Sequence, residues 1–162
     1  MAKHRLRDYF AELYVAGAFA DEGWNIYFPR RDEGFDFIVT RWHNNEILVR
    51  PVQVKGKYAT ASKTDKGGYG FSGELSAIHD EMILAIPFFI PSSEKAPVFT
   101  AYLPMPCIRP NQNNPGCYRA LPAYFEDGVP VKRRDYARFF DKSGLKLATS
   151  KMWGSESPRS AF

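Results

Sequence analysis

The sequence predicts a single mixed α/β domain of the α+β kind, and three observations support this. The chain has 162 residues, of which 44% are hydrophobic and 15% aromatic, so it can bury one sizeable core. An apolar pattern with helical spacing opens the chain, and segments that alternate between apolar and polar residues follow it. Two strongly apolar segments and a second helical pattern come later. Together these patterns predict a sheet with helices packed against it.

The first predicted helix covers residues 6–20. Apolar or small residues recur at helical spacing on one face, at Leu6, Phe10, Leu13, Gly17 and Ala20. The adjoining stripe holds Tyr9, Glu12, Ala16 and Phe19. Gly23 predicts the end of this helix, because glycine readily adopts the left-handed conformation in which many helices end.

Three strands are predicted next, over residues 24–28, 35–42 and 47–55. In the second of them, alternation places Asp36 on the face opposite Phe35 and Phe37. Residues 43–45 predict a hairpin turn into the third strand. Pro51 lies in that third strand and has no amide hydrogen, so it predicts a sheet edge, a bulge or a local break in the ladder.

The rest of the chain gives a less regular pattern. Residues 56–73 hold five of the twelve glycines and predict a mobile loop, and residues 73–80 suggest a short helical turn. Residues 82–89 and 98–103 predict buried strands. Residues 104–122 are rich in proline and asparagine and predict no regular element. A helical pattern returns over residues 134–147, with four apolar anchors at Tyr136, Phe139, Phe140 and Leu147, and the tail after residue 153 is expected to be unstructured.

Charge and cysteine content limit the class of protein. The net charge of +4 favours polyanionic partners without requiring one. Basic residues cluster at positions 3–7, 30–31, 55–66 and 132–134, and each cluster is equally consistent with a role in solubility. We expect a cytoplasmic protein without a membrane segment, because no secretory signal opens the chain and the longest apolar run is too short to span a bilayer. Cys107 and Cys117 are expected to be free thiols, and their spacing disfavours zinc.

Residues suited to phosphodiester chemistry coincide in the first third of the chain. Glu12 lies on the first helix, Asp36 opens the second strand, and Gln53 and Lys55 share one face of the third. Asp36 and the side-chain carbonyl of Gln53 would offer hard oxygen ligands to a cation such as Mg²⁺. The ammonium group of Lys55 would hold the attacking water and offset charge in the transition state. Glu12 would bind the metal through water or orient the nucleophile, and it is equally consistent with a surface glutamate.

These residues resemble the PD-(D/E)xK nucleases of the restriction-endonuclease-like superfamily, especially Holliday-junction-resolvase-like and homing-endonuclease-like members. The match covers residues 5–58 and rests on Glu12, on Gly34-Phe35-Asp36 and on Gln53-Val54-Lys55. The resemblance implies an αβββαβ core with a mixed central sheet flanked by helices. It also implies hydrolysis of nucleic acid, expected to be DNA, with Mg²⁺ or Mn²⁺ as cofactor, and often a homodimer.

The same resemblance extends to ligands and boundaries. It implies that the main-chain carbonyl of Val54 is a further metal ligand. It makes residues 1–153 one nuclease-like domain, in which residues 104–150 are a family-variable elaboration, and residues 154–162 a flexible tail.

The chain departs from the family pattern at two positions. Phe35 stands where the signature proline would be, and Gln53 replaces the second carboxylate, which should weaken cation affinity. Two alternatives therefore stay open. One is a nuclease-like fold that has lost cleavage and acts as a nucleic-acid-binding or interaction module. The other is an unrelated α/β domain in which Gln53 and Lys55 point away from Asp36.

Neighbouring residues supply rivals and additions to this site. Asp32 and Glu33 compete with Asp36, and we prefer Asp36 because a strand holds a ligand more rigidly than a turn. Beyond Lys55, three lysines that would clamp phosphates and a tyrosine that would stack on a base are candidates for nucleic-acid binding: Lys57, Lys63, Lys66 and Tyr69. A solubilising loop explains these four residues equally well.

Overall fold

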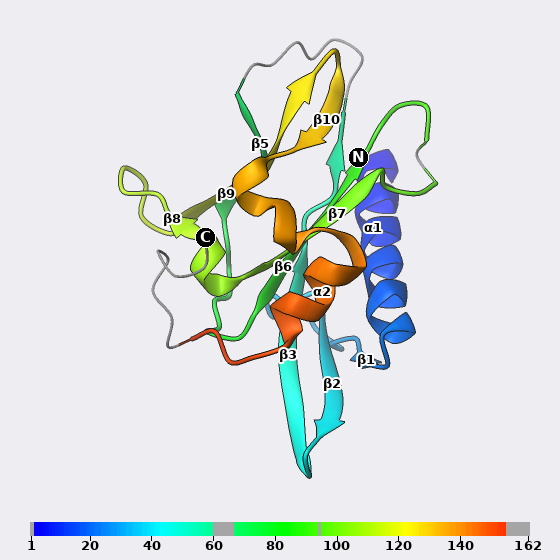
Figure 1. Cartoon of the computed structure of the whole chain (residues 1–162), viewed down its shortest axis with the longest axis vertical. Coiled ribbons are helices and arrows are strands. Elements are labelled where there is room, and N and C mark those ends of the chain that lie inside the picture. The colour runs from blue at the N-terminus through cyan, green and yellow to red at the C-terminus, as the bar shows by residue number, and fades with distance from the viewer. Residues whose placement is uncertain (1, 60–66, 94, 155–162) are drawn as a thin grey trace.

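The computed structural model describes residues 2–59, 67–93 and 95–154, and the side chains among them from Leu6 onward (Figure 1). It is a mixed α/β structure with a mixed open sheet, so the α+β class is confirmed. In chain order the elements are α1 (Ala2–Asp21), β1 (Asn25–Tyr27), β2 (Phe37–His43), β3 (Glu46–Val54), β4 (Lys57–Tyr58), β5 (Gly68–Glu74), β6 (Ile83–Phe89), β7 (Phe99–Pro104), the 3₁₀ helix η1 (Met105–Cys107), β8 (Arg109–Pro110), β9 (Cys117–Glu126), β10 (Val129–Lys132), the 3₁₀ helix η2 (Arg134–Phe139) and α2 (Asp141–Thr149).

The larger sheet, sheet A, contains β1, β2, β3, β4, β6 and β7. Its first three strands form an antiparallel meander, β3 runs parallel to β6, and β7 runs antiparallel to β6 on the other side. Val54 of β3 lies opposite Ala85, and Lys57 of β4 lies opposite Phe88, so both strands follow β6 in the same register. The chain therefore breaks its strand for only two residues, 55 and 56, and this break carries Lys55.

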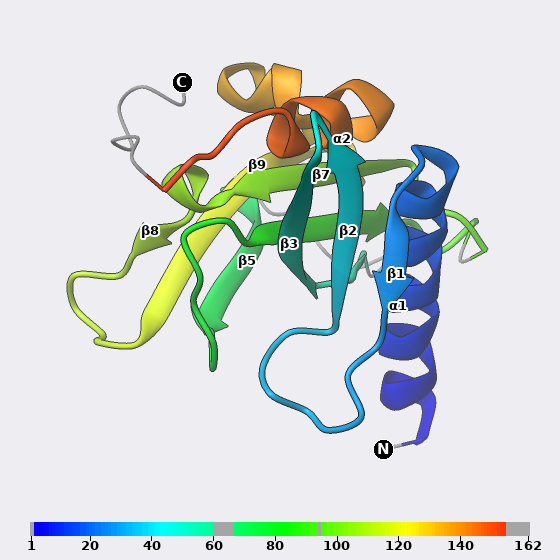
Figure 2. The same cartoon turned by 90° about the horizontal axis from the view of Figure 1, so that it is seen from below.

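The smaller sheet, sheet B, joins β10, β9 and β5 in that order, and β8 pairs with β9. It packs on the face of sheet A opposite α1 (Figure 2). Alternation along β6 explains the two resulting cores. Leu84, Ile86 and Phe88 belong to the core facing sheet B, and Ile83 and Ala85 belong to the core facing α1. Sheet A is thus buried on both faces in its middle.

The predicted first helix and hairpin are confirmed. After α1, Gly23 has a φ of 84°, and the amide of Trp24 donates to the carbonyl of Phe19 at 3.1 Å. In the hairpin turn Asn44 and Asn45 both have left-handed backbones, with φ values of 48° and 63°. Such angles suit a tight turn between twisted strands. Pro51 pairs with Ile38 in an unbroken β2–β3 register, and pairing of β3 with β6 begins one residue later, which fits a sheet edge at Pro51 and not a break in the ladder.

The loop predicted over residues 56–73 is wrong in part, because β4 and β5 lie within it. Two of the glycines there, Gly68 and Gly70, permit close packing. A Cβ on Gly70 would collide with the carbonyl oxygen of Ala120 in β9, next to a register shift in the β5–β9 pairing. The short helical turn predicted over residues 73–80 is also wrong, because 73 and 74 end β5 and the next six residues form no helix. Residues 60–66 of the loop that was expected to be mobile, and residues 155–162 of the tail that was expected to be unstructured, lie outside the described residues.

The two buried strands and the second helical pattern predicted for the C-terminal half are confirmed. The two apolar segments are the buried strands β6 and β7, and the second helical pattern corresponds to η2 and α2. Of its anchors, Tyr136, Phe139 and Phe140 are buried and Leu147 is partly buried. Residues 104–122, for which no regular element was predicted, form η1, β8 and the first part of β9, so that prediction is wrong. Both cysteines are free thiols, and no described helix is long and apolar enough to cross a membrane.

The αβββαβ order implied by the nuclease resemblance is matched only at its start. The helix α1 and the meander β1–β3 follow that order, and β6 lies parallel to β3. Between β3 and β6, however, the described residues hold no helix. They form β4 and β5 instead, and β5 belongs to the second sheet.

Candidate nuclease-like site

Asp36 and Lys55 are fixed at the break in sheet A by backbone hydrogen bonds. The amide of Asp36 donates to the carbonyl of Val52 at 2.9 Å, and the Asp36 carboxylate accepts the amide of Val54 at 2.5 Å. The amide of Lys55 donates to the carbonyl of Ala85 at 2.9 Å. Asp36 therefore reaches across the start of the β2–β3 hairpin and holds the end of β3, directly before Lys55.

Glu12 joins this site from α1. The pKa of Glu12 is raised to about 7, mainly by partial burial and then by the negative charges of Asp36 and Asp8, whereas the charge of Lys55 opposes the shift. Burial also raises the pKa of Asp36, against the Val54 amide and the Lys55 ammonium, which lower it. The structure thus brings Glu12, Asp36 and Lys55 into one electrostatic cluster. Two carboxylates share a partly desolvated place, and a single cation relieves only part of the cost.

Gln53 is adjacent to this cluster but has another contact pattern. Its side chain is only 3% exposed, and its amide nitrogen donates to the carbonyl oxygens of Gly34 and, at 3.1 Å, Ala77. Gln53 therefore ties the loop before β2 to the segment after β5. With the nitrogen committed to two main-chain carbonyls, the amide oxygen is the atom that remains for a ligand.

The main-chain carbonyl of Val54 lies on the Asp36 side of β3. In an extended strand the N–H and C=O of one residue point to the same side, and the N–H of Val54 points to Asp36. The peptide oxygen proposed as a further ligand is therefore directed toward the same edge as the Asp36 carboxylate.

An open cleft of about 410 Å³ lies beside the two carboxylates. It is lined by Tyr9, Glu12, Phe28, Pro29, Asp32, Phe35 and Asp36. Asp32, the rival candidate, thus lines the same cleft, but from an exposed turn in which its carboxylate accepts the amide of Gly34 at 3.0 Å. Tyr9 precedes Glu12 by one helical turn, so helix periodicity gives its place. No pattern in the sequence signalled Phe28, because its place depends on how the loop after β1 folds back toward α1.

The residues proposed for nucleic-acid binding differ in where the structure places them. Tyr69 is 7% exposed, its ring packs against Phe88 and Phe125, and burial raises its pKa to about 12. Its ring belongs to the core and is not available to stack on a base, which corrects that expectation. The ammonium of Lys57 lies 5.7 Å from the Tyr69 ring centroid. Lys63 and Lys66 lie outside the described residues.

The candidate site offers few side chains that could bind a metal ion. Among the residues that the structure describes, no group of three or more His, Cys, Asp and Glu side chains is placed to hold a metal ion. Glu12 and Asp36 supply two carboxylates, and any further ligand would come from amide or peptide oxygens, water or substrate. Comparisons with protein families, with characterised proteins and with solved structures give no significant match to this chain. The geometry of the site is therefore the basis for inferring its function.

Proposed function

We propose that the protein is a metal-dependent endonuclease that hydrolyses phosphodiester bonds of nucleic acid, with DNA as the expected substrate. The observation that carries this proposal is the cluster of Glu12, Asp36 and Lys55 beside an open cleft. Two carboxylates with raised pKa values stand next to one lysine at the end of a central strand. Raised pKa values in a cleft are typical of functional sites, because such pairs are costly to keep for structure alone.

The donor chemistry fits Mg²⁺ or Mn²⁺ that binds together with substrate. Mg²⁺ is usually held by one or two carboxylates, several waters and the phosphates of the substrate, and not by a closed protein cage. Asp36 would be a direct ligand through the oxygen that does not accept the Val54 amide. The carbonyl of Val54 and the amide oxygen of Gln53 would be further oxygen ligands, and Glu12 would bind through water. When bound, the ion neutralises the scissile phosphate and makes a water more acidic.

Lys55 and Glu12 have separate roles in this proposal. The Lys55 ammonium is close enough to lower the pKa of both carboxylates, and it would offset the negative charge that builds on the phosphate in the transition state. Glu12, with a pKa of about 7, exchanges a proton near neutral pH and suits the orientation or deprotonation of the attacking water.

A second candidate function rests on Gln53. Its amide nitrogen binds two main-chain carbonyls, so this residue has a structural role that explains its presence without any metal. A nuclease-like protein that binds nucleic acid without cutting it fits this observation. The two candidates differ in one measurable property, the metal-dependent breakage of a phosphodiester bond.

The test uses the purified 162-residue chain with plasmid, single-stranded and branched DNA, with Mg²⁺, Mn²⁺ or EDTA. Asp36→Asn keeps an oxygen that can accept the Val54 amide but removes the charge, and Lys55→Met keeps most of the side-chain volume. Both variants should lower cleavage about a hundredfold or more. The matched control Asp32→Asn removes an acid from the same cleft and should change cleavage by less than about threefold if Asp36 is the ligand.

Metal binding has a readout besides activity. Mg²⁺ that binds only the folded state raises the melting temperature, and this rise should be lost in Asp36→Asn but kept in Asp32→Asn. Cleavage that persists in EDTA, or that survives in both Asp36→Asn and Lys55→Met, would contradict the proposal. Binding of DNA by a wild-type protein that never cuts it would favour the second candidate.

A further inference from the structure

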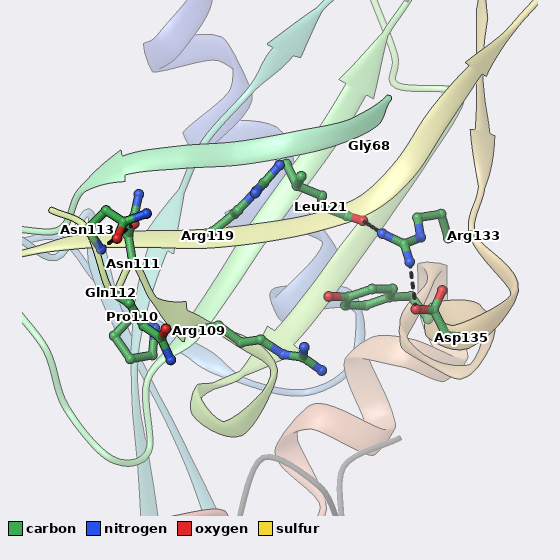
Figure 3. Close-up of a pocket in the computed structure, with 11 residues that line it drawn as sticks. Gly68, Arg109, Pro110, Asn111, Gln112, Asn113, Arg119, Leu121, Arg133 and Asp135 are labelled. Carbon is green, nitrogen blue, oxygen red and sulfur yellow. Dashed lines mark hydrogen bonds and ion pairs between the residues drawn. The ribbon is translucent and has the colours of Figure 1, made fainter. Parts of the chain in front are cut away.

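A second hollow, with a volume of about 540 Å³, lies over sheet B beside η2 (Figure 3). Three arginines from different parts of the chain line it. Arg109 comes from β8, Arg119 from β9, and Arg133 directly follows β10. We call this hollow the basic groove, and it includes the amide-rich turn of residues 111–113. Asp135 is the one acid among the residues that line it.

Two like charges face each other in the basic groove. Arg109 and Arg119 are exposed and lie directly opposite each other in the β8–β9 register. Like charges at directly opposed positions destabilise a strand pair. Asp135 is paired with Arg133 at 2.9 Å, and within the described residues no carboxylate forms an ion pair with Arg119. An anion bound between the two strands removes this repulsion.

Hydrogen bonds within the protein position other donor groups of the basic groove. The Arg133 guanidinium is positioned by the carbonyl of Leu121 at 3.3 Å and by Asp135, as Figure 3 shows. The turn that carries three amide side chains is also ordered. Its Asn111 amide donates to the carbonyl of Cys117 at 2.8 Å, and the Asn111 side chain accepts the amide of Asn113 at 3.1 Å. Planar guanidinium groups and amide donors are the groups that recognise phosphate oxygens in proteins.

We infer that the basic groove binds the sugar-phosphate backbone of a nucleic-acid strand. Its arginines come from β8, from β9 and from the position between β10 and η2, and they line an open surface, whereas a site for one small phosphate would gather them around a single point. An adjoining hollow shares Gly68 and Arg133 with the groove and adds Arg134, which lengthens the basic surface. A phosphate backbone offers charges at regular intervals along such a surface.

The inference rests on the proposed nuclease and names its substrate-binding surface. β5 links the basic groove to the candidate nuclease-like site. Its first residue, Gly68, lines the groove, and the Lys55 ammonium lies 5.9 Å from the ring centroid of Phe71, which is also in β5. Three residues of a strand span about 10 Å. In the order β10-β9-β5, β5 is an outer strand. A nucleic acid held in the basic groove would therefore pass over this outer strand on its way to the candidate site.

The test measures affinity by fluorescence anisotropy, with labelled single-stranded and duplex oligonucleotides in EDTA so that no cleavage occurs. Arg109→Gln/Arg119→Gln should weaken binding about tenfold or more and lower the slope of log K against log salt by about two. The matched control Lys142→Gln/Lys146→Gln removes the same charge from α2, and its affinity should stay within about twofold of the wild type. Arg119→Gln alone, at an exposed position, gives a smaller loss in a variant expected to fold.

Two outcomes would overturn the inference. One is an affinity and a salt slope in Arg109→Gln/Arg119→Gln equal to those of the control. The other is displacement of the oligonucleotide by micromolar pyrophosphate, because the groove would then take a small phosphorylated ligand. Cleavage by the wild type with Mg²⁺ is measured on the same oligonucleotides. Loss of binding in the arginine variants without any wild-type cleavage would sustain the groove and reject the nuclease, and the reverse pattern would reject the groove alone.

Discussion

At the scale of single residues, Glu12 shows how a site can act against the stability of its fold. Its pKa is raised from 4.5 to about 7 by burial and by the charge of Asp36, so its ionised form is disfavoured in the folded state. Between these two pH values the folded protein holds a proton that the unfolded chain has released. The contribution of Glu12 to stability is therefore present below about pH 4.5 and is lost as the pH rises through about 7.

Glu12→Gln should remove the loss of stability that the wild type shows as the pH rises. At pH 8 the variant should be more stable than the wild type by on the order of 1 kcal/mol, a value reduced for the partial exposure of the side chain, and at pH 4 the two should agree. Urea denaturation at both pH values measures the difference. Glu33→Gln, in the exposed loop before β2, is the matched control and should leave the pH dependence unchanged. If the stability of Glu12→Gln depended on pH as that of the wild type does, Glu12 would not be the source of the loss of stability at higher pH.

Gln53→Glu tests whether the motif or the local contacts decide the residue at this position. The change introduces the carboxylate of the nuclease motif that the sequence resembles, yet an ionised carboxylate cannot donate to the carbonyls of Gly34 and Ala77. We expect a loss of stability of about 2–4 kcal/mol at pH 8 and a smaller loss at pH 5, where a protonated carboxyl donates one hydrogen bond. Thermal and urea denaturation at the two pH values measure it.

Gln53→Met serves as the reference for Gln53→Glu, because it removes the same hydrogen bonds without adding a charge. Equal losses of stability at pH 5 and pH 8 in the glutamate variant would contradict this account. A gain in cleavage with unchanged stability would mean that the carboxylate binds a cation and does not face the two carbonyl oxygens.

The sequence predicted the neighbours of Asp36 and Lys55 better than those of Gln53. Strand alternation and a short hairpin relate residue 36 to residues 53–55, and these are local constraints. The partners of Gln53 come from positions 34 and 77, and the second of these depends on how β5 and β6 pack. A glutamine that donates to main-chain carbonyls and one that offers its oxygen to a metal have the same sequence signature.

At the scale of elements, β5 is held by close backbone packing that its glycines permit. A Cβ at Gly70 would collide with Ala120 and Pro122 of β9, whereas one at Gly67 would meet nothing within 4 Å. Gly70→Ala should therefore destabilise the protein by about 1–3 kcal/mol, and Gly67→Ala should be close to neutral. Urea midpoints with unchanged m-values measure both effects. Equal midpoints for the two variants would contradict this account of β5.

The same strand shows why part of the fold could not be predicted. Glycine-rich composition is the usual sign of a loop, and here it accompanies a strand with a register shift against β9. The partner lies about fifty residues further along the chain, so no local pattern reveals it. By contrast α1, the β2–β3 hairpin and β6 were predicted, because helix periodicity, an Asn-Asn turn and a strongly apolar segment are all local signals.

At the scale of the whole molecule, two hydrophobic cores share the strands of sheet A. Trp24 is buried in the core beneath α1, and Trp153 is buried in the core beneath sheet B. Trp153 is also tied to the turn that precedes β6, because the carboxylate of Glu81 accepts the amides of Trp153 at 2.9 Å and Gly154 at 2.8 Å. Adjacent residues of β6 enter opposite cores, so loss of one core removes the support of the other. The two cores should therefore unfold as one cooperative unit.

The tryptophans provide the measurement of this cooperativity. Trp42 is 67% exposed on the hairpin, and Trp42→Phe leaves one buried reporter in each core. Adding Trp24→Phe or Trp153→Phe then isolates a single reporter, and circular dichroism of each variant gives its global transition. We expect the fluorescence and circular dichroism midpoints to coincide within each variant, even though each change lowers stability by about 1–2 kcal/mol. A Trp153 signal lost at lower urea than the circular dichroism signal of the same variant would instead divide the chain into two units, and the proposed single domain over residues 1–153 would fail.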